Sequence, residues 1–272
     1  MLAIAGCACG DTTRNLSYDP TSVPYGVFDL YRPKNTPSDK PLPTVLLVHG
    51  GGWMSGNKGD WEFSAQGHDF ADLLTCHGYC VVSANYRLTS SGPSGPGSPW
   101  PAQIQDVRKV FDYIRTHPEL GVDPNRIAVM GASAGGHLSL LLGLMGNPPR
   151  PRCIIDVSGE SDLDRPPTEV MSNYDGLMGL VLGHGPPFAH GELQAMSPVN
   201  FLRSDAKVLI VHSDGDSNVY VKQGDVLNAA LNTTGTPHAY IRLHGTDHGS
   251  DVFKNNPDVT NKVIAFLDTS LR

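Results

Sequence analysis

Short apolar runs alternate with helical patterns along most of this chain. The segments Thr44–Val48, Arg126–Met130 and Ala206–His212 have the length and composition of buried strands. Between such runs, as in the segment 104–114, apolar residues recur at helical spacing. Strands that alternate with helices predict an α/β protein with a mostly parallel central sheet and helices on both faces.

A serine stands between glycines in Gly131–Gly135, directly after one predicted strand and before the apolar run Gly136–Gly143. A chain that passes from strand to helix in one sharp turn needs small flanking residues, and it holds the hydroxyl of Ser133 out in the open. The amides at the start of the helix would face negative charge that develops beside this hydroxyl. The motif alone leaves open a glycine-rich turn of a nucleotide-binding fold.

A second glycine-rich segment, His49–Trp53, follows another predicted strand. If it lies against the serine turn, the amides of Gly51, Gly52 and Ala134 converge on one oxygen and stabilise the anion of a tetrahedral intermediate. A phosphate-binding loop is disfavoured, because the chain has neither the G-x-x-x-x-G-K-[ST] motif nor G-x-G-x-x-G with an acidic partner.

A serine nucleophile needs a base, and in α/β-hydrolases the histidine comes last in the chain. His248 fits best, because it lies in a loop of small residues between a predicted strand and the C-terminal helix. His238 and His244 flank that strand, and we expect them to be structural.

The acid that orients the histidine should follow the strand Ala206–His212. Asp216 is preferred because its surroundings look like the H-G-x-x-D-x-x-V loop of the hydrolases, with Ser213 in place of the usual glycine. Asp214 remains the alternative. Asp247 is a poor candidate, because neighbouring side chains in extended chain point apart.

With these residues in place, the chain resembles the α/β-hydrolase superfamily. Within it, the chain is similar to the esterase and lipase group with HGGGW and GxSxGG motifs, related to hormone-sensitive-lipase-like enzymes and to bacterial acetyl and feruloyl esterases. The resemblance covers nearly the whole chain after about Leu16 and includes Ser83–Leu88, Trp100–Gln103 and Gly121–Ile127. It implies Ser133 as nucleophile, His248 as base, Asp216 as its partner, and no metal or cofactor.

The chain departs from the hormone-sensitive-lipase-like pattern in its cap. Only about fifty residues precede His49, which leaves no room for a large N-terminal cap. We expect residues 1–16 to be an N-terminal tail and 17–272 to form one hydrolase domain. The segment of about 162–204 mixes apolar residues with prolines and predicts a short lid, and an ordinary connecting helix is the alternative.

The expected activity is that of a serine carboxylesterase that acts on small to medium acyl or aryl esters, such as feruloyl esters or acetylated xylan. Trp53, Tyr86 and Trp100 are expected to form an apolar wall against the substrate. The alternatives are an amidase or peptidase of the same fold, or a non-catalytic binding module, although no triad residue is missing.

The composition limits the partners. A net charge of −7 argues against nucleic acid or an anionic membrane surface, and no segment approaches the roughly 20 apolar residues of a membrane span. The five cysteines have no metal-ligand spacing, and most are expected to be reduced and buried. The segment Ile4–Cys7 looks like a lipoprotein cleavage site without its basic leader. The location is therefore open: cytoplasmic, or exported and lipid-anchored. The oligomeric state is also open.

Overall fold

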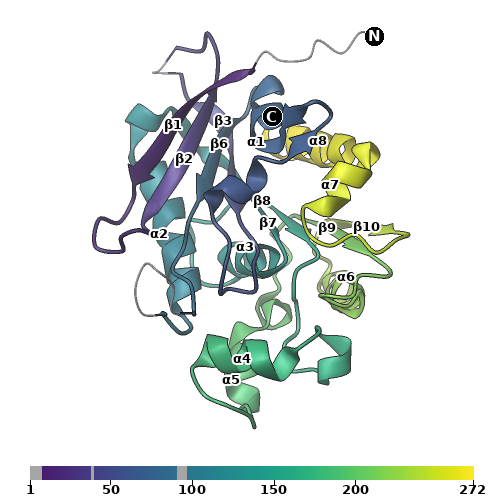
Figure 1. The fold of residues 1–272 in the computed structure, drawn as a ribbon. Helices are drawn as coiled ribbons and strands as arrows, with labels where there is room; N and C mark the ends of the chain where they lie inside the picture. The colour runs from purple at the N-terminus through teal and green to yellow at the C-terminus, as the bar shows by residue number, and fades with distance from the viewer. Residues whose placement is uncertain (1–7, 38–39, 91–96) are drawn as a thin grey trace.

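The computed structural model describes residues 8–37, 40–90 and 97–272. Its main sheet has eight strands in the order β1-β2-β6-β3-β7-β8-β9-β10, and a two-stranded sheet pairs β4 with β5 (Figure 1). The strands are β1 (Gly10–Ser17), β2 (Val27–Pro33), β3 (Leu42–Val48), β4 (Ser64–Ala65), β5 (His68–Asp69), β6 (Cys80–Ala84), β7 (Val122–Ala132), β8 (Cys153–Val157), β9 (Val208–Ser213) and β10 (His238–Leu243).

The helices follow the strands in alternation, as the sequence pattern predicts. The α-helices are α1 (Phe70–Cys76), α2 (Ala102–Thr116), α3 (Ala134–Leu144), α4 (Tyr174–Leu182), α5 (His190–Met196), α6 (Lys222–Thr234), α7 (Asp251–Asn255) and α8 (Pro257–Leu271). The described residues also form four short 3-10 helices: η1 (Lys58–Trp61), η2 (Pro118–Leu120), η3 (Pro167–Glu169) and η4 (Pro198–Phe201).

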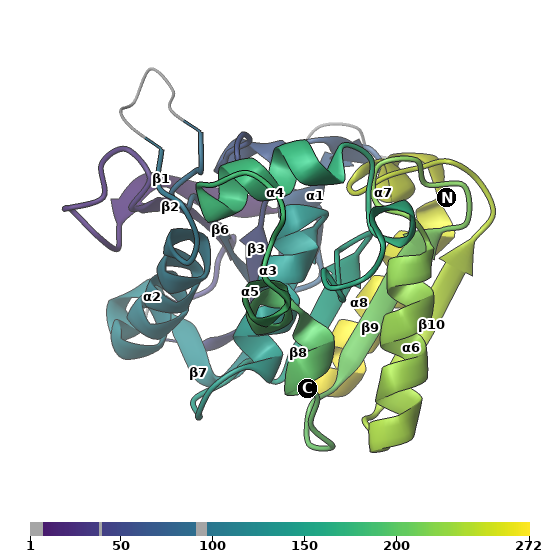
Figure 2. The same ribbon diagram turned by 90° about the horizontal axis from the view of Figure 1, so that it is seen from below.

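All strand pairs from β6 to β10 along the main sheet are parallel, and only β2 runs against the others, since it pairs antiparallel with both β1 and β6. Alternate residues of β3 enter the two halves of the core: Leu46 and Val48 face one cluster, and Val45 and Leu47 face the other. Helices α2, α3 and α6 cover the first face, with α3 between α2 and α6 in Figure 2, and α1, α7 and α8 cover the second. The predicted mostly parallel sheet with helices on both faces is confirmed.

The topology brings distant segments to one edge of the sheet. Strands β3 and β7 are parallel neighbours with Val48 opposite Gly131, so the chain leaves both strands at the same edge. Strands β9 and β10 are also parallel neighbours, with Ser213 opposite Leu243. The four loops that carry the candidate chemistry therefore start along the carboxyl edge, where open α/β sheets bind their ligands.

The expectation of a tail over residues 1–16 needs correction. Residues 10–17 form the edge strand β1, although most of its side chains are exposed. An edge strand is held by backbone bonds to β2 and needs little apolar surface, so a hydrophobic pattern gives no signal for it. Residues 1–7, with the lipoprotein-like segment at Cys7, lie outside the described residues.

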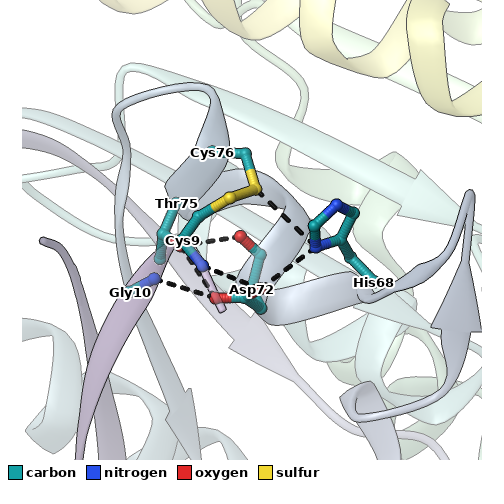
Figure 3. The surroundings of a disulfide bond; sticks show 6 residues. All are labelled: Cys9, Gly10, His68, Asp72, Thr75 and Cys76. Carbon is teal, nitrogen blue, oxygen red and sulfur yellow. Dashed lines mark hydrogen bonds and ion pairs between the residues drawn. A yellow bond between two sulfur atoms is a disulfide. The ribbon is translucent and has the colours of Figure 1, made fainter. Parts of the chain in front are cut away.

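A disulfide joins Cys9, just before β1, to Cys76 at the end of α1 (Figure 3). The backbone N–H groups of Cys9 and Gly10 also donate to the carboxylate of Asp72 in α1. The expectation of reduced, buried cysteines is therefore wrong for this pair, and it holds for Cys80 and Cys153. Among the described residues, no helix combines the length and apolarity that a bilayer crossing requires.

Candidate active site

Ser133 occupies the sharp turn between β7 and α3, with φ 55° and ψ −128°. Both flanking glycines are required by close backbone approach. A Cβ on Gly131 would lie 2.0 Å from the carbonyl oxygen of Gly135, and a Cβ on Gly135 would lie 2.2 Å from that of Val48. The strained turn thus exists only because these positions lack side chains, and it sets Ser133 on the wall of a cavity.

His248 and Asp216 meet beside this cavity. The Nδ1 atom of His248 lies 2.7 Å from Oδ2 of Asp216, whose side chain is fully buried. The other oxygen, Oδ1, accepts the backbone N–H groups of Asn218 at 2.9 Å and Val219 at 3.2 Å. The carboxylate is therefore held in place, and it can fix both the tautomer and the orientation of the imidazole.

Ser133 and His248 line the same cavity. The loop of His248 also lies close to the serine turn, because a Cβ on Gly249 would come 3.6 Å from the Cβ of Ala132. Within the described chain, no hydrogen bond joins the Ser133 hydroxyl to the His248 ring. Contacts of this kind often tighten only when substrate is bound.

The glycine loop after β3 packs against the serine turn. A Cβ on Gly50 would lie 3.3 Å from the Cβ of Ser133. Gly51 and Gly52 both have positive φ, and their N–H groups donate to no other group in the described part of the molecule. Ala134 is the first residue of α3, where N–H groups have no partner within the helix. These three amides are available to an oxygen in the cavity. Gly51 and Gly52 line the cavity, and Ala134 does not.

Tyr86 and His49 hold the glycine loop from behind. The hydroxyl of Tyr86 donates to the carbonyl oxygen of His49 at 3.0 Å, and its ring stacks on the His49 ring at 4.1 Å. Burial lowers the pKa of His49 to about 4, so its imidazole is neutral. Its Nδ1 lies 2.8 Å from the carbonyl oxygen of Gly50 and donates to it, which leaves Nε2 without a proton.

The expected aromatic wall is wrong. Trp53 and Tyr86 are fully buried, Trp100 packs partly buried against the same core, and none of them lines the cavity. The indole of Trp53 donates to Nδ1 of His137 at 3.2 Å, and Trp100 lies against the same imidazole. These aromatic side chains stabilise the loops around the cavity from inside the core.

The remaining candidates take structural positions. Asp214 pairs with His244, whose Nδ1 lies 2.7 Å from Oδ2 of the aspartate. His238 bonds the carbonyl oxygen of Thr236 and the side chain of Asn228. Asp247 binds the side-chain amides of Asn255 and Asn256. Neither Asp214 nor Asp247 contacts His248, which leaves Asp216 as its partner.

The cavity has a volume of about 480 Å³ and opens at the carboxyl edge of the sheet. Residues from the segment 162–204 contribute to its wall, since Met171, Ser172 and Leu177 line it. This segment contains α4 and α5, which lie together beyond α3 in Figure 1. It is tied to the loop of Asp216, because the N–H of Ser172 donates to the carbonyl oxygen of Asn218 at 2.9 Å.

Two buried acids lie next to the candidate triad, and sequence reasoning missed both. Glu160 lines the cavity with only 2% of its surface exposed, and Asp156 is fully buried in β8. Burial raises the pKa of Asp156 to about 7 and that of Glu160 to about 8. Asp156 is the one polar residue within the apolar strand β8, which gives no signal of a functional role, and no motif marks Glu160.

One group of side chains has the composition of a metal site. The donor atoms of Cys9, His68, Asp72 and Cys76 all lie within 4.8 Å of one another (Figure 3). Metal ligation by cysteine requires the thiolate, and both sulfur atoms are consumed by the disulfide. Two ligands, His68 and Asp72, remain, and this cluster does not fit a metal ion in the disulfide-bonded form.

Comparison with known proteins supplies the relationship. Residues 28–231 match the BD-FAE family of α/β-hydrolase esterases. The matched residues include the glycine loop, the serine turn and the loop of Asp216. The chain belongs to the BD-FAE family. His248 lies beyond the matched residues.

Individual proteins agree with this placement. The chain is 27% identical to Esterase LipC of Mycobacterium tuberculosis over 84% of this chain and 58% of that protein. It is 27% identical to dipeptidyl aminopeptidase BIII of Pseudoxanthomonas mexicana over 80% of this chain and 32% of that protein. The chain thus spans less than two thirds of these relatives.

Among solved structures, a truncated carbohydrate esterase from gut microbiota superposes with a TM-score of 0.80. The match covers 98% of both chains at 22% sequence identity, and it shows the shared α/β-hydrolase fold.

Proposed function

We propose that this protein hydrolyses carboxylic esters through a serine acyl-enzyme, with Ser133 as nucleophile, His248 as general base and Asp216 as the group that orients it. The observation that carries the proposal is the buried 2.7 Å contact between Asp216 and His248 beside the cavity that Ser133 also lines. Relatives named as esterases, such as LipC, support the same reaction class.

The reaction follows from the roles of these groups. Ser133 Oγ attacks the ester carbonyl carbon while the His248 ring nitrogen that faces away from Asp216 takes its proton. The carbonyl oxygen becomes an oxyanion and accepts hydrogen bonds from the amides of Gly51, Gly52 and Ala134. The imidazolium then protonates the leaving alcohol. A water molecule, activated by the same imidazole, attacks the acyl-enzyme and releases the acid and Ser133.

The cavity favours small to medium acyl or aryl esters. Its volume of about 480 Å³ is at the small end of the usual range for ligand pockets. We propose that residues of about 162–204 act as a short lid, because Leu177 stands over Gly52, whose added Cβ would lie 3.1 Å from Leu177 Cδ2. An acylated carbohydrate is one candidate substrate, since a structural neighbour is described as a carbohydrate esterase.

A peptidase or amidase is the second candidate, because one relative is named a dipeptidyl aminopeptidase. This chain spans only 32% of that protein. The same triad serves both reactions, and the leaving group distinguishes them.

The test combines covalent labelling with paired substrates. A fluorophosphonate probe should label the wild-type protein and not Ser133→Ala, and p-nitrophenyl acetate should be hydrolysed far faster than the matched p-nitroanilide. Absence of labelling, or labelling that persists in Ser133→Ala, would contradict the acyl-enzyme mechanism. Preference for the anilide would support the amidase instead.

A further inference from the structure

Glu160 is held firmly on the cavity wall. The strand before it is tied to the serine turn, since the N–H of Ser133 donates to the carbonyl oxygen of Val157 at 2.8 Å. Gly159 packs so tightly on the first turn of α3 that an added Cβ would lie 2.8 Å from the amide nitrogen of His137. On the other side, Ser161 donates its backbone N–H to Gln223 Oε1 at 2.8 Å. Both neighbours are fixed, so the position of Glu160 is set before any ligand arrives.

The carboxyl group of Glu160 has no partner for one of its oxygens. Its Oε2 is buried and makes no hydrogen bond within the described residues. Two more atoms in side chains that line the same cavity share this property: Nε2 of His49 and Nε1 of Trp61. Buried polar atoms are nearly always paired, and those without a partner in a binding cavity point to groups that the ligand supplies.

We propose that Glu160 determines substrate specificity by binding a hydroxyl group of the ester. This inference rests on the proposed ester hydrolysis at the same cavity. An ester without the hydroxyl would displace solvent from the cavity and leave the carboxyl unpaired. Sites built to pair with a substrate hydroxyl discriminate strongly against the analogue that lacks it.

The protonation state of Glu160 suits a hydroxyl group as its hydrogen-bond partner. Burial raises the pKa of Glu160 to about 8, so the neutral acid predominates near pH 7. A neutral carboxyl both donates and accepts a hydrogen bond, and a hydroxyl does the same. His49 Nε2 can accept a bond and Trp61 Nε1 can donate one, which suits a substrate with more than one hydroxyl.

Several titratable groups face Glu160 or share its cavity. They are Asp156 on β8, Tyr86 after β6, Asp216 and His248 on the loops after β9 and β10, and His49 and Asp60 on the segment after β3. The negative charges of Asp156 and Asp216 add to the effect of burial and favour the neutral form of Glu160. The donor is therefore present below about pH 8 and is lost as the pH rises through that value.

The experiment measures ratios of kcat/KM for matched esters. One pair places the hydroxyls on the alcohol side (glycerol monoacetate and propyl acetate), and the other places one on the acyl side (ethyl 3-hydroxybutyrate and ethyl butyrate). The wild type should favour the hydroxylated ester in at least one pair. The preferred pair identifies which side of the ester faces Glu160.

The variants separate hydrogen bonding from structure. Glu160→Leu should lower the hydroxyl preference about 10- to 100-fold. Glu160→Gln keeps a donor that does not titrate, so it should retain the preference and remove its fall between pH 7 and 9. Asp156→Asn, a change in a nearby buried acid that does not line the cavity, is the matched control at pH 6, where Asp156 and Glu160 are both mainly protonated, and its ratios there should equal those of the wild type.

Labelling by a fluorophosphonate checks that each variant keeps a folded site, and p-nitrophenyl acetate turnover by the wild type tests the proposed function separately. Ratios that do not change in Glu160→Leu would overturn the proposal. So would a change in pH profile that is equal for both esters of a pair, because Glu160 would then act through Asp216 and His248 rather than on the substrate.

Discussion

Two aspartate–histidine pairs lie side by side at the carboxyl ends of β9 and β10. Both have the same Nδ1 to Oδ2 distance of 2.7 Å, in Asp216–His248 and in Asp214–His244. Their surroundings differ. The side chain of His248 is 21% exposed and that of Asp216 is buried, whereas His244 is 96% exposed and Asp214 27%.

The difference shows that distance alone does not define a catalytic pair. In water, an ion pair at the surface is screened and its geometry is loosely held. Behind the cavity, Asp216 is fixed by two backbone amides and shielded from solvent, so it can hold the imidazole in one orientation beside Ser133. Burial and position along the cavity wall distinguish the two pairs.

The largest effect is expected from Ser133→Ala, which removes the atom that the buried pair is proposed to activate. We expect kcat on p-nitrophenyl acetate to fall by about 10⁶-fold, the loss seen when a comparable serine is removed. Substantial turnover in this variant, with unchanged thermal stability, would mean that the buried pair serves another nucleophile.

The next largest effect compares the two aspartates directly. Asp216→Asn should lower kcat by about 10⁴-fold, because an amide favours the wrong tautomer of the histidine. Asp214→Asn is the matched control and should change kcat by less than about threefold, since surface substitutions away from the site have small effects. An equal loss of kcat in both variants would show that burial does not explain which of the two pairs takes part in catalysis.

Removal of the disulfide separates loss of stability from loss of catalysis. The Cys9–Cys76 bond closes a loop with a sequence separation of 67 residues, and its replacement in Cys9→Ser/Cys76→Ser should lower the free energy of unfolding by about 2–4 kcal/mol in urea titrations. The bond lies outside the cavity, so kcat of the folded variant should stay near that of the wild type.

Thiol titration checks the bond itself. The denatured wild type should expose two more thiols with reductant than without it, because Cys9 and Cys76 are bonded to each other. Equal numbers of titratable thiols with and without reductant would contradict the disulfide.

Asp156 extends the contrast between buried and exposed carboxyls to stability. Its pKa is raised to about 7 by burial, so the folded state binds the proton more tightly than the unfolded chain. The stabilisation is fully present below about pH 4 and is lost as the pH rises through 7. Asp156→Asn cannot ionise, and its Tm should exceed that of the wild type by a few degrees at pH 8.5 and not at pH 5. An equal difference at both pH values would exclude this ionisation.

The smallest effect concerns the exposed pair. Hydrogen bonds from Gly245 and His244 lower the pKa of Asp214, so its contribution to stability is present at neutral pH and is lost as the pH falls into the acidic range. Because the pair is exposed, Asp214→Asn should change the Tm barely beyond measurement error at low salt, and not at all in 1 M salt. A large change in Tm that does not depend on salt would show that Asp214 makes an interaction shielded from solvent.

The sequence predicts those parts of the site that depend on local backbone geometry. The glycines around Ser133 are needed within five residues of one another, so a single-sequence motif reveals them. The expected partner of His248 is confirmed as a contact, because the two residues follow adjacent strands in the order typical of the fold. Their catalytic roles remain predictions.

The errors share a different origin. Trp53 and Tyr86 were expected at the substrate, since they stand next to reactive loops in the chain, but their side chains turn into the core. The pairing of Cys9 with Cys76 depends on an edge strand that packs on α1, and neither partner carries a local signal of it. The contacts between residues 162–204 and the loop of Asp216 also join segments that lie far apart in the chain.

The sequence by itself determined the alternation of strands and helices, the serine turn, the glycine loop and the order of the candidate triad. These depend on residue type and on near neighbours, through strand and helix periodicity and steric limits on the backbone. Only the tertiary structure decided which aromatic side chains are buried, which aspartate meets His248, which cysteines are bonded, and that Glu160 stands unpaired in the cavity. Burial and electrostatic environment arise from segments far apart in the chain, so they take definite values only once the sheet has brought those segments together.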